Sequence, residues 1–396
     1  MNVFAQIRAV VMMNFRCLPQ RVASSAVVVI GIAGVVTVLI SVMSLSKGLA
    51  HTLASTGRPD RAIVLGSGPG TEVGSTLSRA AALTILDAAQ VARNTAGQSV
   101  GSMEVLVSGS VSRRDGDITG SVAFRGVSEQ ARELRPEVKL AEGRWFRAGV
   151  RELVAGRGAQ ARFKGLDVGD RVRFGDDEWT VVGAFTSGGD ARESELQADA
   201  ETVMSAYQRP AFNAVTVQLT STDAFDAFKN ALTTNPALTV NVQREPDYYA
   251  RQSGQFASLL SLVATVVGAV MAIGAVFAAL NTMYTSVSSR TREIATLRAL
   301  GFGAAAVVAS VLTEALLLAL AGALVGSALA WLIFNGNTVS TLSGSGGLAQ
   351  VVFELRIGFE LVGLGIVWAC GVGLLGGMLP ALRAARIPVA TALRAV

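Results

Sequence analysis

Residues 286–301 read SVSSRTREIATLRALG, and this short charged stretch separates two long apolar segments of the chain. It holds three arginines and one acid: Arg290, Arg292, Arg298 and Glu293. Apolar residues such as Ile294 and Leu297 recur at spacings of three and four, which predicts a small amphipathic helix. Gly301 follows the last apolar residue, where helices commonly end. We therefore expect a charged helical hairpin between two membrane spans, shaped to contact a partner in the cytoplasm.

The composition of the chain is that of a membrane protein. Of its 396 residues, 51% are hydrophobic and 16% are charged, and the mean hydropathy is +0.47. A soluble domain typically carries about 25% charged residues. Four runs contain no charged residue: 22–46, 252–289, 315–353 and 361–382. Each run is long enough to cross a bilayer, which takes roughly 20 apolar residues, so four spans are predicted.

The predicted fold class is an α-helical membrane protein with four transmembrane helices and an α+β external domain inserted between spans one and two. The expected order is an interfacial helix at 1–21, span one with a stalk at 22–57, the external domain at 58–247, a stalk with span two at 248–285, the hairpin helix at 286–303, span three at 304–334, a loop at 335–356, span four at 357–382 and a tail at 383–396. Strand-like segments between about 150 and 205 predict a β-rich subdomain inserted in the external domain.

Local patterns predict the elements of the external domain. Alternating segments indicate strands at 61–65, 104–111, 121–127, 214–219 and 238–242. Helical spacing indicates helices at 77–92 and 223–233, the second capped by Thr222. The acid-rich segment SGGDARESELQADAE at 187–201 lacks the spacing of a calcium loop. We expect it to be an exposed, mobile loop.

The positions of the arginines predict the orientation in the membrane. Basic residues precede span one, lie in the hairpin and follow span four, whereas the connection between spans three and four holds only Arg356. Because cytoplasmic loops carry the excess of basic residues, both termini and the hairpin are expected in the cytoplasm. The external domain and the 335–357 loop then face the other side. The arginines flank spans instead of lining one surface, which excludes nucleic-acid binding.

The residues needed for common chemistries are missing from the sequence. No glycine is followed by lysine, so the phosphate-binding loop of an ATPase cannot form, and any ATP must be bound by another chain. His51 is the single histidine, and the cysteines Cys17 and Cys370 are far from it in sequence. This set supports neither a metal site nor a disulfide framework. The chain is therefore expected to be non-catalytic and to bind no metal or cofactor.

Span three carries one acid, Glu314, at a depth where a charge costs a few kcal/mol unless it is paired or protonated. Two interpretations stay open: a carboxylate hydrogen-bonded near the interface, or a carboxylate facing the bundle interior that couples the hairpin to the spans. Small residues recur every fourth position on two helix faces: Gly322, Gly326 and Ala330 on span three, and Gly365, Ala369, Gly373 and Gly377 on span four. Such faces predict close helix packing, either of span three on span four or at a dimer seam.

Four segments together resemble the FtsX-like permease family with a MacB-type periplasmic domain. They are 288–330, with its acid at Glu314, the segment 13–36 around the start of span one, the closing segment 379–394 and the β-rich block 154–185. This family supplies the membrane subunits of mechanotransmission, or type VII, ABC transporters. The resemblance covers nearly the whole chain. The sequence shows no counterpart of the nucleotide-binding domain that is fused in MacB, so the ATPase is expected on a separate subunit.

The resemblance implies a permease subunit in a bacterial inner (cytoplasmic) membrane, paired with a second permease as a homodimer or heterodimer. It also implies a separate ABC ATPase that carries ATP and Mg²⁺, with 286–303 as the coupling helix. The implied coupling residues are Arg290, Arg292, Glu293, Ile294, Leu297 and Arg298. A membrane fusion protein or another periplasmic partner is a further candidate. The expected function is export or extraction of a drug, peptide, lipid or lipoprotein; the alternative is a signalling scaffold that activates a periplasmic partner such as a cell-wall hydrolase.

Overall fold

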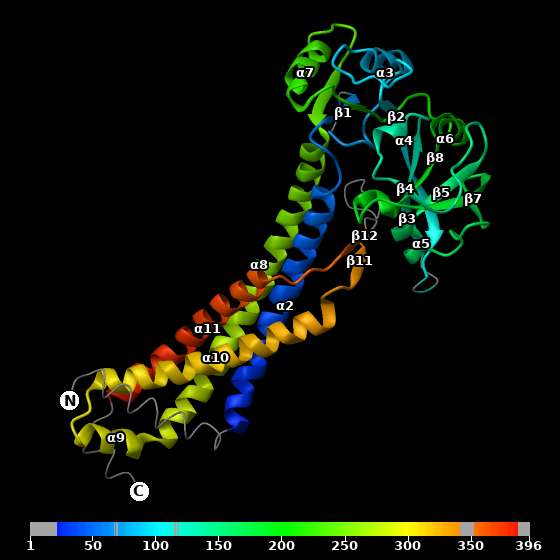
Figure 1. Ribbon diagram of the computed structural model, residues 1–396. Coiled ribbons are helices and arrows are strands. Elements are labelled where there is room, and N and C mark those ends of the chain that lie inside the picture. The colour runs from blue at the N-terminus through cyan, green and yellow to red at the C-terminus, as the bar shows by residue number, and fades with distance from the viewer. Residues whose placement is uncertain are drawn as a thin grey trace. The chain divides into compact units, whose positions relative to one another are not determined.

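The structure is a computed structural model that describes residues 22–66, 68, 70–114, 116, 119–340 and 352–386 (Figure 1). It divides into two compact units. The first holds the described residues up to Lys47, Ala257–Asn337 and those from Leu355 onward; the second holds Gly48–Phe256 and the described part of Thr338–Glu354. The interfacial helix predicted at 1–21 and the tail beyond 386 lie outside the described residues.

Long apolar helices form the first unit. They are α2 (Val22–Ala54), α8 (Glu245–Ser289), α10 (Ala304–Phe334) and α11 (Phe359–Ala385), with the short α9 (Thr291–Ala299) between α8 and α10. Within the described residues, four helices are long and apolar enough to cross a membrane. A helix satisfies all of its backbone hydrogen bonds internally, which is why uncharged runs of this length are helical in lipid. Both α2 and α8 continue without a break into the second unit.

Glycines on α10 allow it to lie close to α2. A Cβ on Gly322 would be 2.9 Å from Cβ of Ile32, and one on Gly326 would be 2.5 Å from the carbonyl oxygen of Ala33. Side chains of any size at these two positions would push the helices apart. The spacing predicted a close contact for this face, and the contact is with span one of the same chain.

The glycines of α11 make the remaining close contacts of the bundle. A Cβ on Gly373 or on Gly377 would lie 2.7 Å from a methyl group of α10, at Ala319 or Ala315 respectively. Gly365 faces α2, where its Cβ would lie 3.0 Å from Val36. Span four therefore packs on span three, as one of the two predicted alternatives has it.

The second unit is built on one ten-stranded sheet in the order β10-β1-β9-β2-β3-β8-β5-β7-β4, with β6 paired to β7. The strands are β1 (Arg61–Gly66), β2 (Gly101–Ser112), β3 (Thr119–Val127), β4 (Lys139–Gly143), β5 (Glu152–Gly156), β6 (Arg171–Phe174), β7 (Asp177–Thr186), β8 (Glu195–Asp199), β9 (Ala214–Gln218) and β10 (Val240–Arg244). The short helices are α3 (Arg79–Leu86), α4 (Ala131–Leu134), α5 (Arg157–Arg162), α6 (Ala200–Ala206) and α7 (Phe225–Thr233), with the 3₁₀ turns η2 (Ala191–Ser194) and η3 (Thr222–Ala224). A separate hairpin pairs β11 (Thr338–Ser340) with β12 (Val352–Glu354).

The β-rich segment predicted from about 150 to 205 joins this sheet. Its strand β8 pairs in parallel with β3 and antiparallel with β5, which connects the segment to the rest of the domain. The two parts share one apolar core, where the Phe124 ring lies 4.8 Å from that of Trp179 and 5.2 Å from that of Phe174. Alternating apolar residues on β3, β6 and β7 therefore meet in a common interior.

Two local predictions are wrong. The acid-rich segment 187–201 is not an exposed loop: it forms η2, the buried strand β8 and the start of α6, and Asp190, Arg192 and Glu195 are each at most 9% exposed. Thr222 does not cap a helix from 223, since it lies in η3, and α7 begins at Phe225 without a side-chain cap. The first error has a physical cause, because Arg125, which is 70 residues away in sequence, pairs with the buried Glu195.

Candidate functional site

The hairpin between α8 and α10 consists of a bend, a short helix and a second bend. Helix α8 continues to Ser289, Arg290 sits at the first bend, and α9 covers Thr291–Ala299. Gly301 has φ of +91°, a left-handed conformation that glycine adopts without strain. This residue lets the chain reverse before α10 begins at Ala304. The segment predicted as one helix thus contains the last turn of α8 and all of α9.

The inner face of α9 is packed against the bundle. Ile294 and Ala295 are 8% and 1% exposed, and Ile294 joins an apolar cluster with Val307 and Val311 of α10 and Ala381 of α11. Burying these side chains fixes α9 to the ends of two spans. A displacement of α9 must therefore move α10 and α11 or break this cluster.

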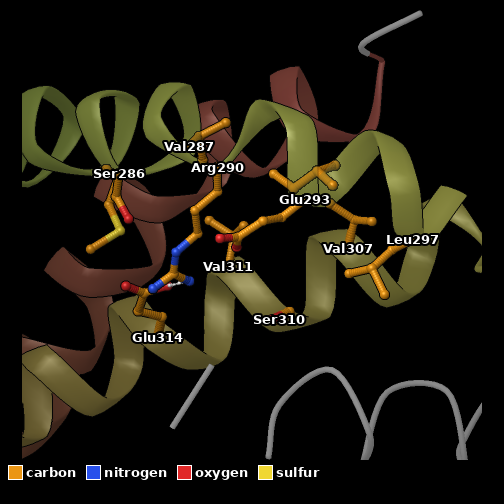
Figure 2. A pocket seen from close by; sticks show the side chains of 11 residues that line it. Ser286, Val287, Arg290, Glu293, Leu297, Val307, Ser310, Val311 and Glu314 are labelled. Atoms are coloured by element: carbon orange, nitrogen blue, oxygen red, sulfur yellow. Dashed lines mark hydrogen bonds and ion pairs between the residues drawn. The ribbon is translucent and has the colours of Figure 1, made fainter. Parts of the chain in front are cut away.

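Glu314 is paired with the arginine at the first bend. Arg290 Nη1 lies 3.2 Å from Glu314 Oε2, and both side chains are 7% exposed (Figure 2). A buried carboxylate is tolerated when an opposite charge is held at hydrogen-bonding distance. Glu314 thus faces the hairpin inside the bundle. The side chain of Arg290 is likewise turned into the bundle and is not exposed at its surface.

Two further arginines connect the hairpin region to α11. Arg298 Nη1 donates a hydrogen bond to the carbonyl oxygen of Ala385 at 2.8 Å. The guanidinium of Arg383 lies over the ring of Tyr284 on α8, 5.6 Å from its centroid. Both cations lie near the end of α11, where unpaired carbonyl groups favour positive charge. The hairpin is therefore held by α10 at Glu314 and by α11 at Ala385.

The outer face of α9 is exposed. Arg292, Thr296 and Leu300 are spaced by four residues, so they share one face, and Leu300 is 73% exposed. Of the six predicted coupling residues, Arg292 and Glu293 are exposed, Leu297 and Arg298 are partly buried, and Arg290 and Ile294 are buried. Thr296 and Leu300, which share this exposed face, were not among the residues predicted from the sequence. The four-residue spacing from Arg292 was the signal that could have found them.

A small pocket lies between α9 and the adjoining parts of α8 and α10. Apolar and polar side chains line it, and those include Ser286, Glu293, Leu297 and Ser310 around the Arg290–Glu314 pair (Figure 2). Glu293 and Leu297, two predicted coupling residues, lie on this side of α9. They face a groove of the hairpin itself.

The second unit contains a buried network of ion pairs centred on Arg125 of β3. Its guanidinium contacts the carboxylates of Glu72, Glu104 and Glu195, each at 2.7 Å, and Arg125 is 2% exposed. Burial alone would raise the pKa of Glu104, but Arg135 and Arg125 lower it to about 2. The charges therefore persist in the interior because each has opposite charge on several sides.

The network extends to the first turns of α8. Arg135 contacts Glu104 at 2.6 Å and Glu245 at 3.3 Å. Arg192 contacts Glu245 at 3.2 Å and donates a hydrogen bond to the hydroxyl of Tyr249 at 3.0 Å. Glu245 and Tyr249 both belong to α8. The start of this helix is thus joined to the sheet by charge-assisted hydrogen bonds, which are stronger than neutral ones.

No group of three or more His, Cys, Asp or Glu side chains is placed to hold a metal ion among the residues that the structure describes. The acids of the network are instead occupied by arginines, as with Glu104 and Glu195.

Two family models match the chain. One, described as the MacB-like periplasmic core domain, matches residues 25–235, more than half of the 396 residues. The other, described as the FtsX-like permease C-terminal, matches residues 265–389, which include the hairpin and Glu314. The chain belongs to the FtsX-like permeases with a MacB-like periplasmic core domain. The family and the fold class predicted from the sequence are confirmed.

Curated relatives place this permease in the ABC transporter permease family. It is 29% identical over 138 residues to the uncharacterized ABC transporter permease YknZ of Bacillus subtilis, which covers 35% of this chain and 32% of that protein. It is 31% identical over 164 residues to the pyoverdine export ATP-binding/permease protein PvdT of Pseudomonas fluorescens, which covers 41% of this chain and 21% of that protein. The matches thus span about a third and a fifth of these relatives.

Solved structures of external domains are also similar to the permease. The periplasmic region of MacB from Actinobacillus actinomycetemcomitans has 16% identity and a TM-score of 0.36, covering 50% of this chain and 94% of that one. The extracellular domain of the noncanonic ABC-type transporter YknZ from Gram-positive bacteria has 14% identity and a TM-score of 0.35, covering 46% of this chain and 100% of that one. The four apolar helices and the periplasmic-domain family indicate an inner-membrane protein.

Proposed function

We propose that this permease couples ATP hydrolysis by a separate ATPase subunit to a conformational change of its external domain. The observation that carries the proposal is the two-sided character of α9. Its inner face is fixed to α10 and α11 through Ile294 and Arg290, while Arg292, Thr296 and Leu300 are exposed. A partner that binds the outer face would therefore move the ends of the spans.

The partner is expected to be an ABC ATPase that carries ATP and Mg²⁺. The sequence offers no Gly-Lys pair for a phosphate-binding loop, so this chain is proposed to be non-catalytic. The name of PvdT describes one protein with both an ATP-binding and a permease part. Its likeness to this chain supports an ATPase partner, and the family resemblance supports a second permease subunit.

The proposed work of the complex is export or extraction of a substrate, for which a drug, a peptide, a lipid and a lipoprotein are candidates. We expect both termini and the hairpin in the cytoplasm, where the ATPase resides, because arginines gather there. Cysteine accessibility at Arg292→Cys, tested with a membrane-impermeant reagent on intact cells and on inverted vesicles, checks this orientation. Labelling in intact cells without permeabilisation contradicts it.

Co-purification tests the ATPase partner. The tagged full chain is purified from its native membranes in mild detergent, and the ATPase is identified by mass spectrometry. We expect Leu300→Asp to reduce recovery of the ATPase at least tenfold, because it places a carboxylate at the C-terminal end of the exposed face, in place of its most exposed apolar side chain. The matched control Leu332→Asn changes a side chain that is 71% exposed on α10. Recovery that is equal for the wild type and Leu300→Asp refutes docking on this face.

A further inference from the structure

Three segments that adjoin the membrane helices contact the turn η2 in the second unit. This turn holds Ala191–Ser194 and is immediately followed by β8. It lies in the segment 187–201, for which the sequence predicts an exposed loop. Its backbone and its arginine contact residues from α8 and from the segment that follows α2, and β12 packs against it.

The first connection comes from the end of α2. The backbone N–H of Ala191 donates a hydrogen bond to Thr56 Oγ1 at 3.0 Å, and that hydroxyl donates to the carbonyl oxygen of Thr52 at 2.8 Å. Thr56 is 0% exposed. Thr52 lies in the last turn of α2. A shift of this turn would therefore displace the Thr56 hydroxyl, which accepts the hydrogen bond from the N–H of Ala191.

The second connection comes from α8. Arg192 is 2% exposed and reaches Glu245 at 3.2 Å and the Tyr249 hydroxyl at 3.0 Å. These two residues are one helical turn apart, so the guanidinium contacts the same face of α8 twice. A rotation of this helix would break one contact or both.

The third connection comes from the segment between α10 and α11. Strand β12 packs against η2, and it also touches α2 at Gly48. A Cβ on Gly48 would lie 2.6 Å from the carbonyl oxygen of Glu354 and 3.1 Å from the ring of Phe353. The glycine thus allows the β11–β12 hairpin to lie directly against α2.

From η2 the path into the sheet is short. Glu195, the first residue of β8, is bound to Arg125 of the neighbouring strand at 2.7 Å. We propose that η2 is the junction at which the movements of the membrane helices are combined and passed to the sheet, with Arg192 as its positioning residue. This inference rests on the proposed function, because it requires an ATPase that moves the helices.

The test uses the tagged chain purified with its ATPase in lipid nanodiscs, with ADP and vanadate as the nucleotide probe. Hydrogen–deuterium exchange of 191–199 is compared with and without the probe. We expect the probe to change this exchange in the wild type. Tyr249→Phe removes the hydroxyl that Arg192 binds and keeps the ring, and it should reduce the change at least threefold.

Tyr248→Phe is the matched control. Tyr248 is the adjacent residue of α8, is 3% exposed against 5% for Tyr249, and accepts a hydrogen bond from the backbone of Glu72 instead of from η2. It should leave the probe-dependent change in place. Thr56→Val, which removes the acceptor of Ala191, is a second independent variant and should act as Tyr249→Phe does.

Three outcomes separate the possibilities. A variant that binds the ATPase and keeps the wild-type melting temperature, yet loses the probe-dependent change, supports the junction. Unchanged exchange responses in both Tyr249→Phe and Thr56→Val overturn the junction and leave the proposed function standing. Failure of the wild type to bind an ATPase overturns the proposed function and the junction together.

Discussion

Replacing the members of the Arg290–Glu314 pair singly and together gives the sharpest test of the hairpin. The two groups are 3.2 Å apart and 7% exposed, so each compensates the charge of the other in a buried setting. Arg290→Met keeps the length and apolar volume of the arginine stem. Glu314→Leu keeps the approximate size of the acid. The double variant replaces both charges with apolar groups that fit a mostly apolar pocket.

The structure sets the expected magnitudes. At 3.2 Å and an effective dielectric constant of about 20, the attraction between the two charges is about 5 kcal/mol. Removing one partner strands a buried charge and should lower the free energy of unfolding by about 3–5 kcal/mol. Replacing both partners removes the attraction and both desolvation costs, so the double variant should lie within about 1 kcal/mol of the wild type or above it. The coupling energy of the cycle is then about 5 kcal/mol or more.

Equilibrium unfolding of the full chain in mixed micelles, with a rising fraction of denaturing detergent, measures the four free energies. Recovery of the ATPase with each variant is measured in parallel, and the double variant should recover it better than either single variant. Losses that add within about 0.5 kcal/mol would refute the reasoning, because independent groups behave in that way. The pair would then be solvated in the membrane, and the buried geometry of the hairpin would be incorrect.

Three further outcomes follow from the contacts described above. Gly326→Val should destabilise the bundle by about 1–3 kcal/mol, because its Cβ would clash with backbone atoms of Ala33. Gly371→Ala should not, because a Cβ at position 371 has no atom within 4 Å. Thermal unfolding of the two variants measures the difference. Loss of ATPase recovery in Leu300→Asp should come without a change in melting temperature, because Leu300 is 73% exposed. Hydrogen bonds from Arg144 lower the pKa of Glu152 from its ordinary value of 4.5 to about 2. The ionised acid therefore stabilises the fold fully above pH 4.5, and this contribution is lost as the pH falls toward 2. The melting temperatures of the wild type and Glu152→Gln should converge over that range, and a constant difference would contradict the assignment.

The membrane part of the fold could be predicted because its signal is local. An uncharged run of sufficient length has one stable structure in lipid, and the arginines between such runs mark the connections. The cost of a charge at bilayer depth likewise marked Glu314 as a residue in need of a partner. Its partner could not be chosen, since Arg290 also satisfies the pattern of an anchor at a membrane surface. Only the bend between α8 and α9 turns it inward.

The second unit was harder because its charges are compensated by residues far apart in sequence. Glu195 is neutralised by Arg125, and Arg192 by Glu245, over separations of 70 and 53 residues. In the sequence, 187–201 therefore has the acidic composition of a solvated loop. The glycine faces were misjudged in part for the same reason. Spacing showed that Gly322 would be in a close contact, but not that the contact would be with α2.

The buried ion pairs also determine how the second unit can change shape. Arg125 holds acids from three separate segments, and Arg135 and Arg192 share Glu245. If one segment moved away alone, it would leave charges in the interior without compensation, at a cost of several kcal/mol. Partly opened states are therefore scarce. The domain should therefore respond to a pull on its helices as one unit, with the pairs kept or broken together and not one at a time.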